Sequence, residues 1–189
     1  MSLTAEQLEQ FVLDLVAQPE LWARVVSRAP HSGINGIASN GIAPNGGAPH
    51  LEITRDVDGA ADDRVYQQIW DDEDVNAWVI CWSEDHDTGF HDHDDSAAAI
   101  TVISGSVREE RLRLGASPSH HEASAGATFT LPATAIHRVL HAGSGPAVTI
   151  HAYSPPLTKS GAYRLKPDGE LLRESVPLEQ ELRAEAALA

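Results

Sequence analysis

At the centre of this sequence stands Gly89-Phe90-His91-Asp92-His93-Asp94-Asp95-Ser96, which holds two histidines one residue apart. Because side chains of an extended strand alternate between its two faces, both imidazoles would point to one side and could reach one metal ion. His137, in the segment Leu131–Val139, is the best candidate for a third ligand. Three neutral imidazoles with open coordination positions suit a divalent transition metal in Lewis-acid or oxygen chemistry. In a chain with ten histidines such a pair alone can arise by chance. The surrounding sequence pattern therefore has to decide whether the pair is a metal site.

Short apolar segments separated by turn residues surround this stretch. The strongest is Asn76–Trp82, which is β-branched and aromatic and has apolar side chains on both faces. Segments recur at roughly 8–12 residues, a spacing typical of an all-β sandwich or barrel. Besides the strand of the two histidines, the expected strands are 50–54, 64–70, 76–82, 98–104, 106–114, 120–123, 127–131, 137–141 and 147–153.

The two ends of the chain differ from this central part. A capping box at Thr4–Gln7 and apolar residues at helical spacing predict N-terminal helices. At 189 residues and 42% hydrophobic, the chain has the size of one well-buried domain. The expected organisation is N-terminal helices over 1–28, a Gly/Pro-rich loop over 29–49, a barrel over 50–165 and a tail over 166–189 with a helix from Val176 to Ala189.

The chain is strongly acidic, with a formal net charge of −15 from 28 acidic and 13 basic residues. This balance disfavours nucleic acid and anionic membrane surfaces as partners. Fourteen of the acids lie between Asp56 and Asp95, where the only basic residue is Arg64. They form either solvated loops or a negative field around the site that would favour cationic ligands.

Cys81 is the only cysteine, so no intramolecular disulfide can form, and its strand-like setting predicts a small core residue. The first residues lack the pattern of a secretory leader, and no apolar run approaches membrane-spanning length. We therefore expect a cytoplasmic protein, as a monomer or small homo-oligomer.

The histidines and glycines together resemble a known pattern. His91-x-His93, then Gly105, then Gly126-x5-Pro132-x4-His137 is similar to the two cupin motifs in order and spacing. The resemblance implies a cupin, a double-sheet β-barrel that holds a metal in its mouth. Cupins usually add a carboxylate ligand four or five residues after the second histidine, where this chain has Ala97 and Ala98. The site is therefore expected to have three histidines.

Further motifs resemble the cysteine dioxygenase family of thiol dioxygenases over roughly residues 60 to 160. They are Cys81-Trp82, His-Asp-His-x-Asp-Ser from His91, Ile136–Val139 and Thr149-x-His151-x-Tyr153-Ser154-Pro155-Pro156-Leu157. The resemblance implies Fe(II) bound by His91, His93 and His137. It also implies oxidation of a small-molecule thiol by O2 to a sulfinic acid, with both oxygen atoms inserted.

Thr149, His151 and Tyr153 alternate at a spacing of two and would project from one face of a strand. The resemblance implies a hydrogen-bonded relay, in which His151 orients the Tyr153 hydroxyl toward the iron-bound ligands. The family often has serine at the position of Thr149, which keeps the hydroxyl. Some members crosslink a cysteine to the tyrosine, and the matching position here is Ala98, which cannot form that bond.

The substrate is less well defined by these motifs. Cysteine-specific members hold the substrate carboxylate with an arginine on an early strand, where this chain most naturally places Gln67, although a shift would bring Arg64 there. Glutamine makes neutral hydrogen bonds in place of a charged bidentate pair. Trp78 and Trp82, with the nearby acids, would suit a cationic or betaine-like thiol such as ergothioneine. Cysteine, the family's commonest substrate, is the alternative.

Two other classes of protein remain open. One is another metal-dependent cupin enzyme, such as a non-thiol dioxygenase or an isomerase, which the Tyr153-Ser154-Pro155-Pro156 motif argues against. The other is a non-enzymatic cupin that binds a small ligand. The retention of three histidines beside the Thr-His-Tyr strand disfavours that class, because a binding module needs no metal triad.

Overall fold

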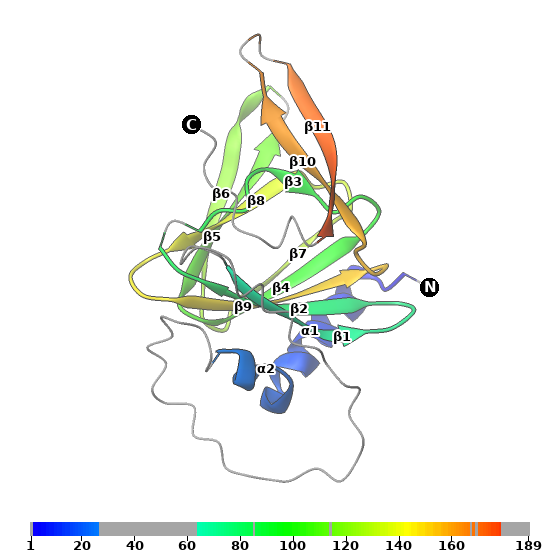
Figure 1. Ribbon diagram of the computed structural model, residues 1–189, viewed down its shortest axis with the longest axis vertical. Coiled ribbons are helices and arrows are strands. Elements are labelled where there is room, and N and C mark those ends of the chain that lie inside the picture. Colours follow the sequence, from blue (N-terminus) through cyan, green and yellow to red (C-terminus); the bar gives the residue numbers. More distant parts are fainter. Residues whose placement is uncertain are drawn as a thin grey trace.

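The computed structural model describes residues 2–26, 64–84, 86–113, 115–166, 168 and 170–178, and the structural statements below concern these. Two helices precede two antiparallel sheets that face each other (Figure 1). The five-stranded sheet has the order β1-β2-β9-β4-β7, and the six-stranded sheet has the order β11-β10-β3-β8-β5-β6. The elements are α1 (Ala5–Val16), α2 (Pro19–Val26), β1 (Val65–Asp71), β2 (Asn76–Trp82), β3 (His91–Asp92), β4 (Ala97–Ser104), β5 (Ser106–Arg113), β6 (Ala116–Ser124), β7 (Thr128–Leu131), β8 (His137–Ala142), β9 (Ala147–Ser154), β10 (Lys159–Leu165) and β11 (Leu171–Pro177).

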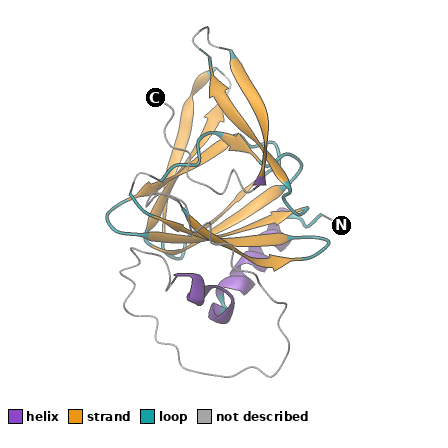
Figure 2. Cartoon of the chain, viewed as in Figure 1, coloured by secondary structure: helices purple, strands orange, loops and turns teal. Residues whose placement is uncertain are grey.

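Helix α1 begins with the predicted capping box. The Thr4 hydroxyl accepts a hydrogen bond from the Gln7 backbone N–H, and the Gln7 side chain accepts one from the Thr4 N–H. Leu8, Val12 and Leu15 recur at helical spacing and are buried. They join one hydrophobic cluster with α2 and the five-stranded sheet, so the helices cover the outer face of that sheet (Figure 2).

Strand β2 shows why this sheet is apolar on both faces. Ala77, Val79 and Cys81 belong to the cluster beneath the helices, whereas Ile80 and Trp82 belong to a second cluster between the two sheets. The alternation follows directly from the period of two in a strand. The second cluster includes residues of both sheets and forms the barrel interior, where the polar site residues described below lie.

The prediction of an all-β, double-sheet cupin fold with N-terminal helices is confirmed. The C-terminal helix is wrong for Val176 and Pro177, because β11 includes both and pairs antiparallel with β10, Val176 opposite Ser160. Pairing with a neighbouring strand here overrides the helix propensity of a Leu- and Glu-rich segment. Leu178 is helical, and the rest of the predicted helix from 179, the loop over 29–49 and the strand over 50–54 lie outside the described residues. None of the helices in the described ranges is long and apolar enough to cross a bilayer.

Candidate metal centre and hydrogen-bonded relay

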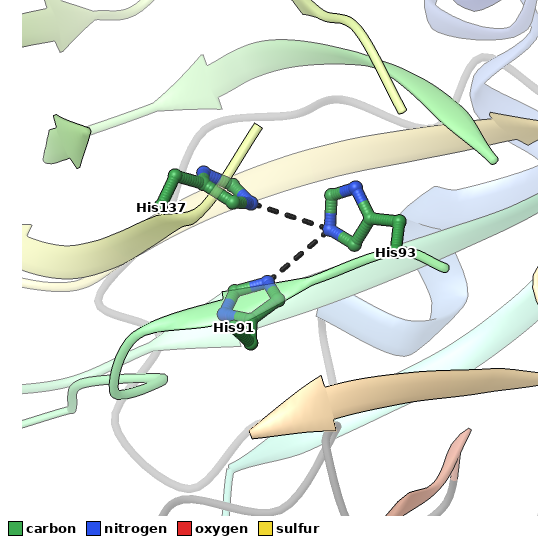
Figure 3. A group of neighbouring side chains, drawn as sticks. All are labelled: His91, His93 and His137. Carbon is green, nitrogen blue, oxygen red and sulfur yellow. Dashed lines mark hydrogen bonds between the residues drawn. The ribbon is translucent and has the colours of Figure 1, made fainter. Parts of the chain in front are cut away.

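Three buried histidines converge inside the barrel (Figure 3). His91 on β3 lies directly opposite His137 on β8, and His93 follows the end of β3. The Nε2 atom of His93 lies 3.2 Å from Nε2 of His91 and 3.2 Å from Nε2 of His137. Strand pairing and the His-x-His spacing therefore bring the three predicted ligands to one point.

The chemistry of this group fits a metal ion. Burial, reinforced by the neighbouring histidines, lowers the pKa of His93 and of His137 well below the usual value. Both imidazoles are therefore neutral. His91 lies with Nδ1 3.1 Å from the carbonyl oxygen of Gly89, which places a proton on Nδ1 and turns Nε2 toward His93. Three imidazole nitrogens that face one another at this distance suit a divalent cation as their common partner.

The strand β9 carries a second polar group next to this centre. His151 lies with Nδ1 3.1 Å from the Tyr153 hydroxyl and with Nε2 2.9 Å from the Thr149 hydroxyl. The ring of Tyr153 packs edge-on against His93, with centroids 4.9 Å apart. All three β9 residues are buried. The structure thus brings Thr149, His151 and Tyr153 together on one face and places them beside the three histidines.

The hydrogen bonds of this relay have a direction. The Trp82 indole N–H can only donate, and it lies 2.8 Å from Thr149 Oγ1. The other polar contact of that hydroxyl among the described residues is Nε2 of His151, so the Thr149 O–H donates to His151. Burial, and then the charge of Arg64, lower the pKa of His151 to about 3, so the ring is neutral. Its single proton therefore lies on Nδ1 and is donated to Tyr153, which leaves the tyrosine's own proton for another acceptor.

Comparison with known proteins agrees with this geometry. The model of the family described as Cysteine dioxygenase type I matches residues 62–166, more than half of the chain. The chain belongs to the cysteine dioxygenase type I family. Cysteine dioxygenase type 1 of Danio rerio is 29% identical over 91 residues, 43% of this chain and 45% of that protein. The protein of the same name from Rattus norvegicus is 26% identical over 97 residues, 47% of this chain and 48% of that protein.

The chain therefore spans about half the length of the curated relatives it matches. Among solved structures, an RmlC-like cupin family protein with a double-stranded β-helix fold from Methanocaldococcus jannaschii superposes with a TM-score of 0.44. It is 17% identical in sequence, and the match covers 56% of this chain and 88% of that one.

One departure from other members of the cysteine dioxygenase family is visible in the strand register. Ala98 on β4 lies directly opposite Tyr153 on β9 and is buried. This is the position expected for the crosslinking cysteine that some members carry. Cys81, the only cysteine of the chain, lies in the cluster beneath the helices, and burial raises the pKa of its thiol to about 12. It is therefore a core residue.

Strand β1 carries the two residues considered for substrate binding. Gln67 pairs with Val79, a member of the helix-side cluster, so its side chain lies on the face away from the barrel interior. Gln68, which the sequence interpretation did not single out, pairs with Trp78 and shares the interior face. The period of two from the interior residue Tyr66 is the signal that could have found it.

Arg64 reaches the interior of the barrel. It is 3% exposed, and its guanidinium lies 4.5 Å from the centroid of the Trp82 ring. Nη2 donates to the carbonyl oxygen of Asp87 at 2.9 Å. Its charge lowers the pKa of His151, so it lies close enough to act on the relay. Of the two candidates, the structure brings Arg64 to the relay and leaves Gln67 on the other face.

The two tryptophans considered for substrate binding also face inward. Trp82 stacks on His151, with ring centroids 6.2 Å apart, and Trp78 lies directly opposite His151 across β2 and β9.

Several acids in the described part of the acidic stretch take part in turns and ion pairs. Asp72 caps the turn between β1 and β2 and accepts a hydrogen bond from Trp70. Asp87 pairs with Arg138 and accepts a hydrogen bond from the Gly89 N–H, while Asp92 and Asp94 pair with Arg173. These contacts favour the interpretation of these acids as turn and ion-pair residues, not as a negative field around the centre.

Proposed function

We propose that this protein is a non-haem Fe(II) thiol dioxygenase that converts a small-molecule thiol, RSH, and one O2 into the sulfinic acid RSO2H. The observation that carries the proposal is the convergence of three buried histidines beside the Thr149–His151–Tyr153 relay. Membership of the cysteine dioxygenase type I family supports it. Both atoms of O2 are consumed by one thiol, so the reaction needs no further reductant.

In this proposal His91, His93 and His137 hold the iron. All three ligands are imidazoles, and the described residues supply no carboxylate to the same point. When bound, Fe(II) would supply the Lewis acidity that favours the thiolate form of the substrate and the redox chemistry that activates O2.

The relay controls one proton at the edge of this centre. Trp82, Thr149 and His151 hold Tyr153 so that its hydroxyl accepts a hydrogen bond from His151 and directs its own proton away from the imidazole. With a pKa of about 3, His151 stays neutral throughout the physiological range and keeps this arrangement. Tyr153 thus acts as a hydrogen-bond donor to substrate or oxidant, and His151 and Thr149 act as the residues that orient it.

For the substrate, we propose a thiol that carries a carboxylate, with cysteine as the first candidate. Arg64 brings a buried positive charge to the interior, and a buried guanidinium favours an anionic group by a charge-assisted pair. The same guanidinium already lies over the face of the Trp82 ring. A cationic or betaine-like substrate would need that face for its own cation–π contact. Gln68 and Trp78 share this face of the barrel and would contact the rest of the substrate.

The test is oxygen uptake by protein loaded anaerobically with Fe(II), with cysteine, cysteamine, 3-mercaptopropionate and ergothioneine. The proposal expects one O2 consumed per thiol and a product heavier by two oxygen atoms. It also expects a preference for cysteine and 3-mercaptopropionate, which have a carboxylate and no quaternary ammonium. Preference for cysteamine would reject the carboxylate proposal, and preference for ergothioneine, which carries both a carboxylate and a quaternary ammonium, would return the substrate to a betaine-like thiol. No uptake with any thiol, at full iron loading, would favour a non-thiol cupin enzyme or a ligand-binding cupin.

A further inference from the structure

Glu109 is an acidic residue on β5 of the six-stranded sheet, between β8 and β6, and the relay does not use it. Its side chain is 1% exposed, although it lies on β5 in a segment that consists mostly of Arg and Glu residues. On this strand it lies opposite Val139 on β8 and opposite His121 on β6. A buried carboxylate is costly unless it is paired and hydrogen-bonded, so its partners indicate what it does.

Two of its partners fix the carboxylate in place. Arg111 donates from Nε to Oε1 at 2.6 Å and, from Nη2, to the carbonyl oxygen of Thr130 at 3.1 Å. His121 approaches Oε2 with Nδ1 at 2.9 Å. The guanidinium and the imidazole thereby tie Glu109 to β6 and β7, and little freedom remains for the carboxylate to rotate.

The third neighbour is a ligand of the candidate metal centre. Nδ1 of His137 lies 3.6 Å from Oε1 of Glu109, and both side chains are 1% exposed. Within the described residues this buried nitrogen has no hydrogen-bond partner, so Glu109 is the acceptor that faces it. The separation is slightly longer than a hydrogen bond, so the contact is an electrostatic one that favours a proton on Nδ1.

We infer that Glu109 is a positioning residue for His137, which holds the imidazole with its proton on Nδ1 and its lone pair on Nε2 toward the metal. A carboxylate behind a ligating histidine raises the basicity of the ligand and fixes its orientation. His91 has a neutral carbonyl oxygen in the same role, whereas the group behind His137 is the carboxylate of Glu109. The inference rests on the metal centre of the proposed function.

The experiment compares Glu109→Gln with Glu110→Gln. Glu110 is the next residue on β5 and pairs with Arg108 and Arg138, so the control removes the same charge from the other face of the strand. Metal-stripped wild type and both variants are titrated with Fe(II) anaerobically, and separately with Co(II), against a chromophoric chelator. We expect Glu109→Gln to weaken metal binding by about 10- to 100-fold, and Glu110→Gln to stay close to wild type.

The outcomes separate this inference from the proposed function. If wild type binds neither metal, the metal centre itself is rejected and the inference with it. If wild type binds and a folded Glu109→Gln variant binds equally tightly, Glu109 has no positioning role.

A second measurement needs no variant and covers the case in which Glu109→Gln does not fold. Long-range 1H–15N spectra of the metal-stripped wild type report the tautomer of each histidine. The inference expects the proton of His137 on Nδ1. A proton on Nε2 would overturn it.

Discussion

The indole nitrogen of Trp82 lies 2.8 Å from the hydroxyl oxygen of Thr149, which is 67 residues away in sequence but on the neighbouring strand of the sheet. This contact gives the relay its direction, because a group that can only donate stands at one end. Thr149 must then pass its own proton toward His151, and the tyrosine proton faces away from the imidazole.

A Thr149→Val variant tests this direction. Valine keeps the shape of threonine but leaves the Trp82 N–H and His151 Nε2 without their shared partner. We expect kcat for the best thiol to fall about 2- to 10-fold, the effect of one net hydrogen bond, with a smaller change in KM. The control is Thr149→Ser, which keeps the hydroxyl and should retain most of the activity. Equal losses in the two variants would show that packing, not the hydroxyl, is what matters.

Arg64 should decide between anionic and cationic substrates. Replacing it with glutamine removes the buried positive charge and leaves a donor of neutral hydrogen bonds. We expect kcat/KM for a carboxylate-bearing thiol to fall by about 10- to 100-fold, as for a hydrogen bond to a charged group. The rate with cysteamine, which has no carboxylate, should change little. Thermal unfolding checks that the variant is folded, and a parallel loss with both thiols would contradict the assigned role.

The stability of the metal-stripped protein should depend on pH through its buried histidines. The pKa values of His93, His137 and His151 are lowered in the folded state, that of His151 to about 3. Below the unfolded value near 6.5 the unfolded chain binds more protons, so the free energy of unfolding falls as pH falls from about 6.5 toward 3. Each histidine contributes a slope of up to about 1.4 kcal/mol per pH unit.

Urea unfolding at several values between pH 5 and 8 measures this slope. The curve should be nearly flat above pH 7 and should fall steeply below 6.5. Asp92 does not interfere in this window, because its stabilising contribution is lost only as pH falls below its unfolded value near 4. A flat curve down to pH 5 would show that the three histidines are not buried in the neutral form.

Hydrogen bonds from the β10–β11 hairpin hold Asp92, the residue between the two histidines, in place. Asp92, between His91 and His93, accepts two hydrogen bonds from Arg173 at 2.7 and 2.8 Å and one from Tyr163 at 2.7 Å. Burial raises the pKa of Asp92, but these hydrogen bonds outweigh it and hold that pKa well below the usual value. The guanidinium reaches across Gly161, where an added Cβ would overlap it. The hairpin of β10 and β11 thereby anchors β3.

An Arg173→Leu variant should therefore lose stability and bind metal less tightly. We expect a loss of about 1–2 kcal/mol in the free energy of unfolding, because the guanidinium is partly exposed and screened. Arg164→Leu is the matched control on the same hairpin, since its pairing with Glu174 is exposed and longer, at 3.6 Å. Urea unfolding measures both variants. A similar effect of the two substitutions would argue against a stabilising role of the Arg173–Asp92 contact.

Local pattern was enough to predict much of this architecture. The His-x-His spacing, the alternation in Thr149–Tyr153 and the two apolar faces of Asn76–Trp82 each depend on the strand period of two. The structure has the corresponding strands. What local pattern could not supply is strand register, which depends on pairings between distant segments. Register separates Gln68 from Gln67, and it places β11 against β10 where a helix was expected.

Glu109 shows the same limit more clearly. In the segment from Ser106 to Arg113 its charge is one of several, and a segment with this many charges resembles a solvent-exposed strand. Its burial results from β6 and β8 on either side and from His137 at the centre of the barrel. A sequence-based test for such residues would need the pairing partners of the strand, not its own composition.

The most direct test of the central claim is the fate of labelled oxygen. Protein loaded with Fe(II) is incubated with its preferred thiol under 18O2, and the product is analysed by mass spectrometry, with His137→Ala as the metal-site control. We predict a sulfinate that carries two 18O atoms, formed by wild type and not by the variant. A product with one or no 18O atom, or equal formation by the variant, would contradict the assignment of a three-histidine thiol dioxygenase.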